Sequence, residues 1–565
     1  MRVLVIGGYG TFGGRLVDLL LDEGRLVVIV AGRSLEKARK FVSARGGSDA
    51  TLEAAEFDRT DPEAGLRHLR PDVVVDATGP FQSYGPDPYR AVRATLAAGA
   101  HWLDLADAAE FVTGIRSLDT LAREAGRFVL SGASSFPVLS TAVVAELAKG
   151  MRIDTVDGGI APSPYAGVGY NVIEAIASYA GKKIPRRVEG RAGHGYGMVD
   201  SRHFTVAVPG EIPLPRTRFA LVEVPDLEVI GELHPEARDV WIGAGPTPRS
   251  LHRLLWLCAH PVKWGMLPSL SFMAPLMDRV VNTVPWGEHR GGMWIRATGA
   301  DAEGAVTRSW HLLAEGDMGP HIPAMACEII IRGLLDGTVP GPGARPASGT
   351  LSLAQYEQVF AARGIKTGFR ERREVQRLGP HRAVMGTAYE RLSAPLRRLH
   401  GLDGQPLHEG VAEVEGATNA LGSLVARVFG FPRAGGAVHV ALDIERHGDR
   451  QRWTRRFGGR AMTSVLEAGK PGSWAEHHLV ERFGPLEFAA ALVERDGGLS
   501  LHLRGWRAFG IPMPRFLMPR TEAREHAEGG RFRFSVEIRL PVIGRLVRYA
   551  GWLEPRPAAH ESEAA

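Results

Sequence analysis

The chain has 565 residues, of which 44% are hydrophobic and 23% are charged, and its formal net charge is +5. This length exceeds what one hydrophobic core supports, so several domains are expected. The basic residues are mostly arginines mixed with aspartate and glutamate, and this pattern argues against a nucleic-acid-binding protein.

The cysteine content and the hydropathy of the chain are typical of a cytoplasmic protein without a bound metal. The two cysteines, Cys258 and Cys327, match no metal-ligand spacing, and the histidines form no H-E-x-x-H motif, so no metal site is expected. No run of about 20 apolar residues is present, which argues against a transmembrane segment. The N-terminus enters a strand directly and leaves no room for a signal peptide. We therefore expect a cytoplasmic protein.

The first predicted element is a short apolar strand, Arg2–Ile6, followed by a glycine-rich turn and a helix with an apolar face. In this turn Gly8, Gly10 and Gly13 fit the pattern G-x-G-x-x-G. Gly8 would allow a tight turn, Gly10 would admit a pyrophosphate to the backbone N–H groups, and Gly13 would let helix and strand pack closely. The residues expected to contact a dinucleotide are Gly7, Gly8, Tyr9, Gly10, Thr11, Phe12 and Gly13.

A second strand, Leu26–Ala31, ends in Gly32, Arg33 and Ser34. Proteins that bind NAD place an acid about 20 residues after the last glycine, where it holds the ribose 2′-hydroxyl. Here Arg33 stands instead, and its guanidinium can pair with a 2′-phosphate while Ser34 adds a hydrogen bond. The sequence therefore predicts NADP(H) as cofactor, although Arg33 could also be a solvated residue at a helix start.

Residues that follow the third and fourth predicted strands are also expected to line the dinucleotide site. The third ends near Asp58, which we expect beside the adenine ring. The fourth, Asp72–Ala77, is nearly all valine and runs into Thr78, Gly79 and Pro80. Ligands bind at the carboxyl edge of such a sheet, so these three residues are expected to wall the nicotinamide ribose. A simple turn remains the alternative.

Strands and helices continue to alternate up to a sixth strand at Phe128–Leu130, which predicts a doubly wound parallel sheet over residues 1–140. Candidate proton donors follow these strands: Tyr84, Asp104, Asp107, Ser134 and Ser135. Each has another explanation, because aspartates after strands often cap helices. Ser134 or Ser135 could likewise cap a helix that begins near Leu139.

Five motifs in this order, GGYGTFG, AGRSLEKA, DATGPFQSYG, HWLDLAD and SGASSFPVLS, resemble the NADP-binding domain of saccharopine-dehydrogenase-like proteins. That family includes saccharopine reductases and trans-acting enoyl reductases. The resemblance implies a reductase with a second α/β domain that covers the nicotinamide and mediates dimerisation, hence a homodimer. It supplies no defined catalytic residue. A set of basic groups for the carboxylates of saccharopine is not evident, which makes saccharopine a doubtful substrate.

Residues 141–375 are predicted to form an α/β substrate and dimerisation domain, and a helix over 320–333 could return to the nucleotide-binding domain. An apolar stretch between Leu254 and Met277 is interrupted by Lys263 and prolines, so it is too broken to span a bilayer. It could pack over the substrate site or at a dimer interface. Alternatively, it could form an apolar lid for a long-chain substrate or make peripheral contact with a membrane.

Residues 376–555 show the period-two alternation of antiparallel strands, and residues 556–565 are expected to be a disordered tail. Motifs such as RWTRRFGG and YAGWL resemble an uncharacterised bacterial domain that often follows such reductases. A curved sheet here could hold an apolar ligand, with Arg455 or Arg456 meeting an acidic head group. A plain hydrophobic core is the alternative. The expected wall residues are Trp453, Phe457, Phe483 and Trp552.

Taken together, these patterns predict an NADP(H)-dependent oxidoreductase of the saccharopine-dehydrogenase-like type. It would transfer hydride to a carbonyl, imine or enoyl group of a small-molecule substrate, and a lipid-like substrate is among the candidates. A non-catalytic NADP(H)-binding sensor or ligand carrier is the alternative, because no proton donor is evident from the motifs.

Overall fold

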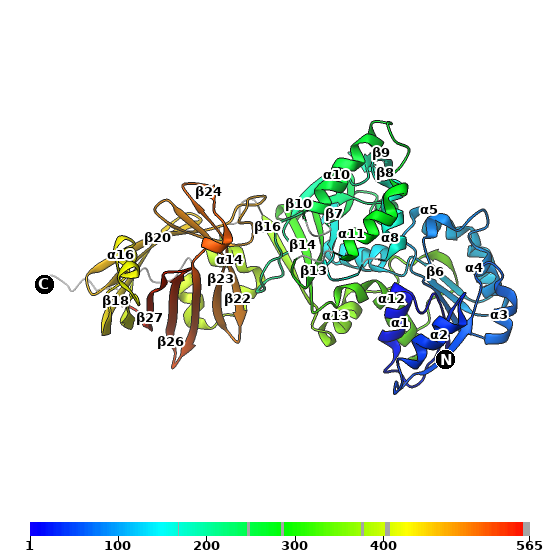
Figure 1. Cartoon of the computed structure of the whole chain (residues 1–565), viewed down its shortest axis with the longest axis horizontal. Coiled ribbons are helices and arrows are strands. Elements are labelled where there is room, and N and C mark those ends of the chain that lie inside the picture. The colour runs from blue at the N-terminus through cyan, green and yellow to red at the C-terminus, as the bar shows by residue number, and fades with distance from the viewer. Residues whose placement is uncertain (168, 246–248, 284–286, 374–377, 402–406, 557–565) are drawn as a thin grey trace. The chain divides into compact units, whose positions relative to one another are not determined.

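The computed structural model describes residues 1–556 except 168, 246–248, 284–286, 374–377 and 402–406 (Figure 1). The chain forms two compact units, the first made of residues 1–203 with 217–367 and the second of 204–216 with 368–565. The domain boundary expected near residue 375 falls outside the described residues, as does the expected tail from residue 557 onward.

The first sheet of unit 1 has seven strands in the order β15-β6-β5-β4-β1-β2-β3, paired in parallel. Its central strands are apolar because both of their faces are covered, and Val73, Val74 and Val75 are all 0% exposed. The predicted doubly wound sheet is therefore confirmed. The strands are β1 (Arg2–Ile6), β2 (Val27–Gly32), β3 (Thr51–Glu56), β4 (Val73–Asp76), β5 (His101–Asp104), β6 (Phe128–Ser131) and β15 (Gly343–Pro346).

Helices cover both faces of this sheet. On one face, side chains of α3, α4 and α6 share a core with Leu4, Ile29 and Val74. On the other face α1 packs against α2, where Gly14 approaches Phe41, and against α12. The helices of this region are α1 (Thr11–Leu20), α2 (Leu35–Ser43), α3 (Pro62–Leu69), α4 (Arg90–Ala97), α5 (Ala109–Gly114), α6 (Asp119–Glu124) and α7 (Ser140–Leu147).

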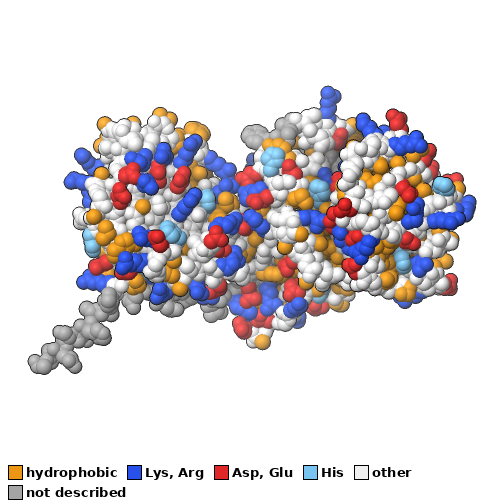
Figure 2. Space-filling view, turned by 90° about the horizontal axis from the view of Figure 1, so that it is seen from below, with side chains coloured by type: hydrophobic (Ala, Val, Ile, Leu, Met, Phe, Trp, Pro, Cys, Tyr) orange, Lys and Arg blue, Asp and Glu red, His pale blue; other side chains and the backbone are white. Residues whose placement is uncertain are grey.

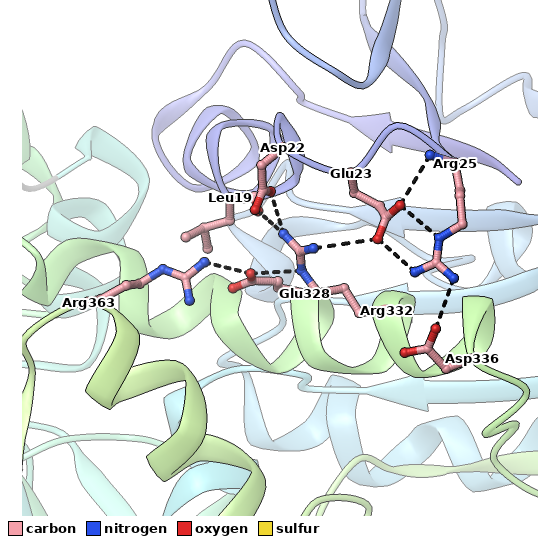
Figure 3. Close-up of polar contacts among 8 residues, drawn as sticks. All are labelled: Leu19, Asp22, Glu23, Arg25, Glu328, Arg332, Asp336 and Arg363. Carbon is pink, nitrogen blue, oxygen red and sulfur yellow. Dashed lines mark hydrogen bonds and ion pairs between the residues drawn. The ribbon is translucent and has the colours of Figure 1, made fainter.

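Helix α12 (Ile322–Leu335) returns from the end of the unit to the first helix, and ion pairs fix it there (Figure 3). The Arg332 guanidinium donates to the Leu19 carbonyl at 2.9 Å and to Asp22 at 2.5 Å. Glu328, only 1% exposed, accepts hydrogen bonds from Arg332 and from Arg363, which follows α13 (Leu353–Ala362). The chain thus passes back to the nucleotide-binding domain before unit 1 ends.

A second sheet in unit 1 contains the strand order β11-β12-β7-β13-β14. Most of its pairs are antiparallel, but β12 pairs with β7 in parallel. Its strands are β7 (Arg152–Ala161), β11 (Thr217–Leu221), β12 (Asp239–Ala244), β13 (Arg290–Asp301) and β14 (Gly304–Glu315), with β8 (Lys183–Val188) and β9 (Arg191–Tyr196) forming a separate hairpin. The helices are α8 (Tyr170–Tyr179), α9 (Asp226–Leu233), α10 (Arg249–Lys263) and α11 (Ala274–Thr283).

Unit 2 is a closed antiparallel barrel of ten strands, because β22 pairs both with β21 and with β23 and so completes the ring. The predicted antiparallel β domain is confirmed. Going round the ring, the strands are β22 (Leu486–Arg495), β21 (Leu479–Phe483), β20 (Arg460–Ala468), β19 (Arg450–Phe457), β18 (Gly435–His447), β17 (Leu407–Glu415), β27 (Gly544–Pro555), β26 (Arg531–Leu540), β25 (Arg520–Glu528) and β23 (Gly498–Ala508), with the short β24 (Ile511–Pro512) added to β23.

Short helices close one end of the barrel. α14 (Pro380–Met385) and α15 (Ala394–His400) place Met385 and Leu396 in one core with Trp453 and Phe532 of the barrel wall. A third helix, α16 (Ala420–Val428), lies between β17 and β18 in the chain. A 3-10 turn over Gly386–Arg391 connects α14 to the segment that leads into α15.

Strands β10 (Ser201–Phe204) and β16 (Lys366–Arg373) lie at the borders between the two units in the sequence. In β16, the guanidinium of Arg370 donates to the carbonyls of Ala207 and Val384, at 2.7 and 2.9 Å. Arg370 therefore serves as a structural hydrogen-bond donor within unit 2.

Charged side chains of both signs are interspersed on the face shown in Figure 2. None of the helices among the described residues is long and apolar enough to cross a membrane. Unit 1 exposes large apolar side chains from α10 to α11, which we call the α10–α11 patch: Leu254, Leu257, Trp264, Met266, Leu267, Phe272 and Leu276.

Candidate functional site

A crevice of about 750 Å³ opens at the carboxyl ends of the parallel strands in unit 1. Its walls come from the loops after β1, β2, β3, β4 and β5, and from residues 169–172 at the start of α8. It lies where the strand order reverses between β1 and β4, which is the position at which doubly wound sheets bind dinucleotides.

The glycine-rich turn forms the floor of the crevice, as predicted, but the individual glycines have other structural roles than those expected. Gly7, not Gly8, takes the left-handed conformation, with φ 76°. Gly13 is needed for packing, since a Cβ there would lie 2.2 Å from the Gly7 carbonyl oxygen. Gly8 and Gly13 do not line the crevice, whereas Gly7, Tyr9, Gly10, Thr11 and Phe12 do.

The N-terminus of α1 faces this floor. Gly10 caps the helix with extended backbone, and the first turn carries no acidic residue. Free N–H groups and the positive end of the helix dipole are therefore available to an anion without competition from a carboxylate. These residues fit the diphosphate of a dinucleotide.

Arg33 lies at the rim of the crevice and is exposed. Its guanidinium makes no hydrogen bond or ion pair with a residue that the structure describes, and so it is available to a ligand. It also lowers the pKa of Asp58, although the Thr60 hydrogen bonds to that carboxylate are the larger cause. Ser34 instead caps α2 by accepting from the Lys37 amide, and it does not line the crevice.

The loop after β4 is held by a buried acid that the motifs did not single out. Asp76 is 0% exposed and accepts hydrogen bonds from the amide and hydroxyl of Thr78 and from the Tyr84 hydroxyl at 3.0 Å. Arg59 lies 3.4 Å from the centre of the Tyr84 ring. Burial, followed by the charge of Asp76, raises the pKa of Tyr84, so its phenol keeps its proton. Tyr84 therefore serves to shape the loop that carries Thr78, Gly79 and Pro80.

A second residue missing from the predictions is Asn171. Its side-chain amide donates to the carbonyls of Thr78 and Gly79, at 2.9 and 3.0 Å. Nearby, Gly169 approaches Thr11 so closely that a Cβ would lie 3.1 Å from its hydroxyl. The start of α8 thus crosses from the second sheet to the crevice and completes its wall. Sequence patterns do not reveal this contact, because residues 78 and 171 are far apart in the chain.

Three of the five candidate proton donors do not line the crevice. Asp104 is fully buried and accepts hydrogen bonds from the Gly132 and Ala106 amides, the Trp102 indole and the Ser131 hydroxyl. Through these bonds Asp104 holds the loops after β5 and β6 in place. Ser134 and Ser135 also lie outside the crevice lining. Ser134 precedes the distorted turn at Ser135–Leu139 without a side-chain capping bond, so the suggested capping role is wrong for Ser134.

Asp107 is the candidate acid that lines the crevice beyond β5. Burial raises its pKa, and its carboxylate accepts a hydrogen bond from the Gln82 side-chain amide at 3.4 Å. Glu223, which accepts the Ala109 amide at 2.9 Å, also has a raised pKa, first from burial and then from the Asp107 charge. Both carboxylates add to the burial that raises the pKa of Tyr179. Burial thus raises the pKa of Asp107, Glu223 and Tyr179, and of these three Asp107 lines the crevice.

Comparison with known proteins agrees with this geometry. Residues 3–183 match the model of the saccharopine dehydrogenase NADP binding domain, and residues 392–553 match the domain of unknown function DUF4166. Among curated proteins, none matches the chain.

Two solved structures have distant likeness to this chain. One, a probable dehydrogenase from Thermotoga maritima, is 10% identical, and the match covers 63% of this chain and 93% of that protein with a TM-score of 0.31. A Gfo/Idh/MocA family oxidoreductase from Vibrio cholerae is 9% identical, covers 60% and 91%, and gives 0.27.

The domain match and the crevice agree on the cofactor, which is NADP(H), and on a dehydrogenase type of nucleotide-binding domain. The chain carries a saccharopine dehydrogenase NADP binding domain at its N-terminus and a DUF4166 domain, built as a closed antiparallel barrel, at its C-terminus.

Proposed function

We propose that unit 1 is an NADPH-dependent reductase that adds a hydride and a proton across a polarised double bond of a small molecule. The bound cofactor supplies the hydride. The observation that carries this proposal is the position of Asp107, an acid of raised pKa in the wall of the cofactor crevice. A carboxyl group whose pKa is raised by burial can act as a general acid.

The cofactor would lie along the crevice with its diphosphate on the start of α1 and its 2′-phosphate at Arg33. The residues proposed to contact it are Gly7, Tyr9, Gly10, Thr11, Phe12, Arg33, Asp58, Thr78, Gly79 and Pro80. Gly8, Gly13 and Ser34 would act indirectly through the local backbone. Loops after β4 and β5 lie on the opposite side of the strand-order reversal from Arg33, so the nicotinamide end would meet Asp107.

The proton step follows from the cluster around Asp107. As hydride reaches the substrate carbon, the oxygen, nitrogen or conjugated carbon of the double bond would take the proton from Asp107. The Asp107 carboxylate left behind is disfavoured by burial and by Glu223. Both effects favour the protonated form of Asp107, so that the proton is present for transfer, and a proton from solvent would restore this form after each turnover.

Kinetics of variants test this assignment. NADPH oxidation is followed with a panel of short- and long-chain aldehydes, ketones, cyclic imines and enoyl thioesters. Asp107→Asn should lower kcat by about 10²- to 10⁴-fold and leave the Kd for NADPH unchanged. Wild-type kcat should fall as pH rises through the pKa of Asp107, and Asp107→Glu should recover part of the rate. The control is Glu110→Gln, an exposed acid on α5.

A full rate in Asp107→Asn would exclude Asp107 as the donor. NADPH binding without consumption across the whole panel would instead favour the non-catalytic sensor.

We also propose that the α10–α11 patch forms a homodimer interface. Seven exposed large apolar side chains in one stretch of 23 residues are unusual for a surface that faces only water. Light scattering of the full chain tests this. A dimer mass that falls to a monomer mass in Phe272→Glu is expected, and a monomer mass for the wild type would contradict the proposal.

A further inference from the structure

The barrel of unit 2 encloses a cavity of about 500 Å³. Inward-facing residues alternate with outward-facing ones along each strand, so that in β26 Phe532, Phe534 and Val536 line the cavity while Arg533 and Glu537 do not. Protein cores are normally close-packed, and an apolar cavity of this size weakens a domain that does not use it. Cavities of about 300–1,000 Å³ are the size of small-molecule sites.

The lining is apolar except at a few points. Trp453, Phe457 and Phe483 belong to the wall, as predicted, but Trp552 points outward and lies under the Arg531 guanidinium instead. An apolar site of this kind excludes water and gains affinity from the hydrocarbon surface of a ligand.

One ion pair lies in the middle of the wall. Arg455 donates to Ser464 at 2.8 Å and to Glu481 at 3.1 Å, and both Arg455 and Glu481 line the cavity. The Glu481 carboxylate also accepts the Ser464 hydroxyl at 2.7 Å. Their side chains are 17% and 22% exposed, so polar atoms of the pair can be reached from inside. Arg456, the neighbouring candidate, is on the outer face and does not line the cavity.

The pair neutralises itself, which decides the kind of head group it can hold. A carboxylate beside Arg455 would also lie beside Glu481, and repulsion between the two anions would offset the attraction of the guanidinium. A second acid in the lining, Glu525, is hydrogen-bonded to His400 at 2.6 Å. A neutral hydroxyl, carbonyl or ester can accept from Arg455 without this repulsion.

The two ends of the barrel differ. One end is closed by α14 and α15, whose core contains Met385, Leu396 and Leu399. The turns at the other end expose apolar side chains, and two of them, Phe429 and Leu517, also line the cavity. The exposed apolar residues at this mouth are Leu421, Leu424, Val428, Phe429, Phe509, Ile511, Phe516, Leu517 and Val542.

We propose that the barrel of unit 2 binds a single-chain lipid with a neutral polar group, such as a long-chain alcohol, ketone or ester. The chain fills the cavity, the neutral group hydrogen-bonds to the Arg455–Glu481 pair, and the ligand enters through the apolar mouth. This site is separate from the NADP(H) crevice and does not depend on the reductase proposal.

Binding of 1-alkanols to the full chain tests the proposal, with displacement of a fluorescent fatty alcohol as the readout. Affinity should rise by about fourfold for each added methylene until the cavity is filled. The alkanoic acid of the same length, at a pH where it is ionised, should bind at least tenfold more weakly than the alcohol. NADPH binding, measured on the same sample, reports on unit 1 independently.

Two variants locate the site. Ala523→Trp on β25 and Ala490→Phe on β22 place bulk inside the cavity, and each should weaken alcohol binding by more than tenfold. Arg524→Trp, one residue along β25 and exposed outside, is the matched control and should bind like the wild type. Circular dichroism and the melting temperature show whether each variant is folded.

Three results would overturn the proposal. The first is the absence of saturable alcohol binding by the wild-type chain, which needs no variant to be informative. The second is unchanged binding in whichever cavity-filling variant is folded. The third is binding of the ionised acid as tight as that of the alcohol, which would reject the neutral head group at Arg455 and Glu481.

Discussion

The side-chain amide of Asn171 donates a hydrogen bond to the carbonyl oxygen of Thr78 at 2.9 Å. This bond joins the start of α8 to the loop after β4. The same amide reaches Gly79 at 3.0 Å. Asn171 therefore acts together with Asp76 to hold the loop proposed to wall the nicotinamide ribose.

Replacing Asn171 should loosen the cofactor site. Asn171→Ala removes two hydrogen bonds, each worth about 0.5–1.5 kcal/mol, so the Kd for NADPH should rise by about tenfold. Titration of intrinsic fluorescence with NADPH measures this. Glu174→Ala on the same helix is the control, because Glu174 does not line the crevice. An unchanged Kd would show that the loop holds its position without Asn171.

A buried acid in unit 1 should make stability depend on pH. Asp226 at the start of α9 is 0% exposed, and burial raises its pKa to about 7, while the Ser140 hydroxyl donates to it. An unfolded aspartate has a pKa of about 3.9, so the unfolded chain ionises first and the folded state loses stability between about pH 4 and pH 7.

Asp226→Asn removes this proton linkage. The stability of the variant minus that of the wild type should therefore increase as pH rises from 4 to 7, by up to about 4 kcal/mol, and then stay level. Urea unfolding at several pH values measures the difference. A difference independent of pH would mean that Asp226 is ionised in the folded state or titrates normally.

Glu328 should be important for the attachment of α12. It is almost fully buried and holds the guanidinium groups of Arg332 and Arg363 (Figure 3). Glu328→Gln leaves two cations without their shared anion, which should destabilise unit 1 by roughly 3 kcal/mol. Thermal unfolding of both variants is the measurement, with Asp336→Asn on the exposed end of α12 as control. Equal melting temperatures would contradict this role.

The sequence predicts the nucleotide-binding domain well because its signals are local. The glycine-rich turn lies between a strand and a helix, and each parallel strand is a short apolar run. These features are fixed by neighbouring residues, so chain order alone places Arg33 and Thr78 at one sheet edge.

The rest of the site depends on contacts between distant residues. The charge of Asp107 raises the pKa of Glu223, a residue 116 positions further along the chain that no sequence motif marked. Asp104 lies at the end of a strand, as expected. It is fully buried, accepts four hydrogen bonds and does not line the crevice. In the barrel, the register between β26 and β27 decides that Trp552 faces outward, and period-two alternation alone does not fix that register.

Cofactor titration tests the central claim most directly. Calorimetry of the purified chain with NADPH and with NADH should show saturable binding with NADPH at least tenfold tighter. Arg33→Ala should remove most of that preference by weakening NADPH alone, because a charge-assisted hydrogen bond to the 2′-phosphate is worth about 1.5–3 kcal/mol. Arg39→Ala, on the exposed side of α2, should keep the preference. Absence of saturable binding of either coenzyme would contradict the account.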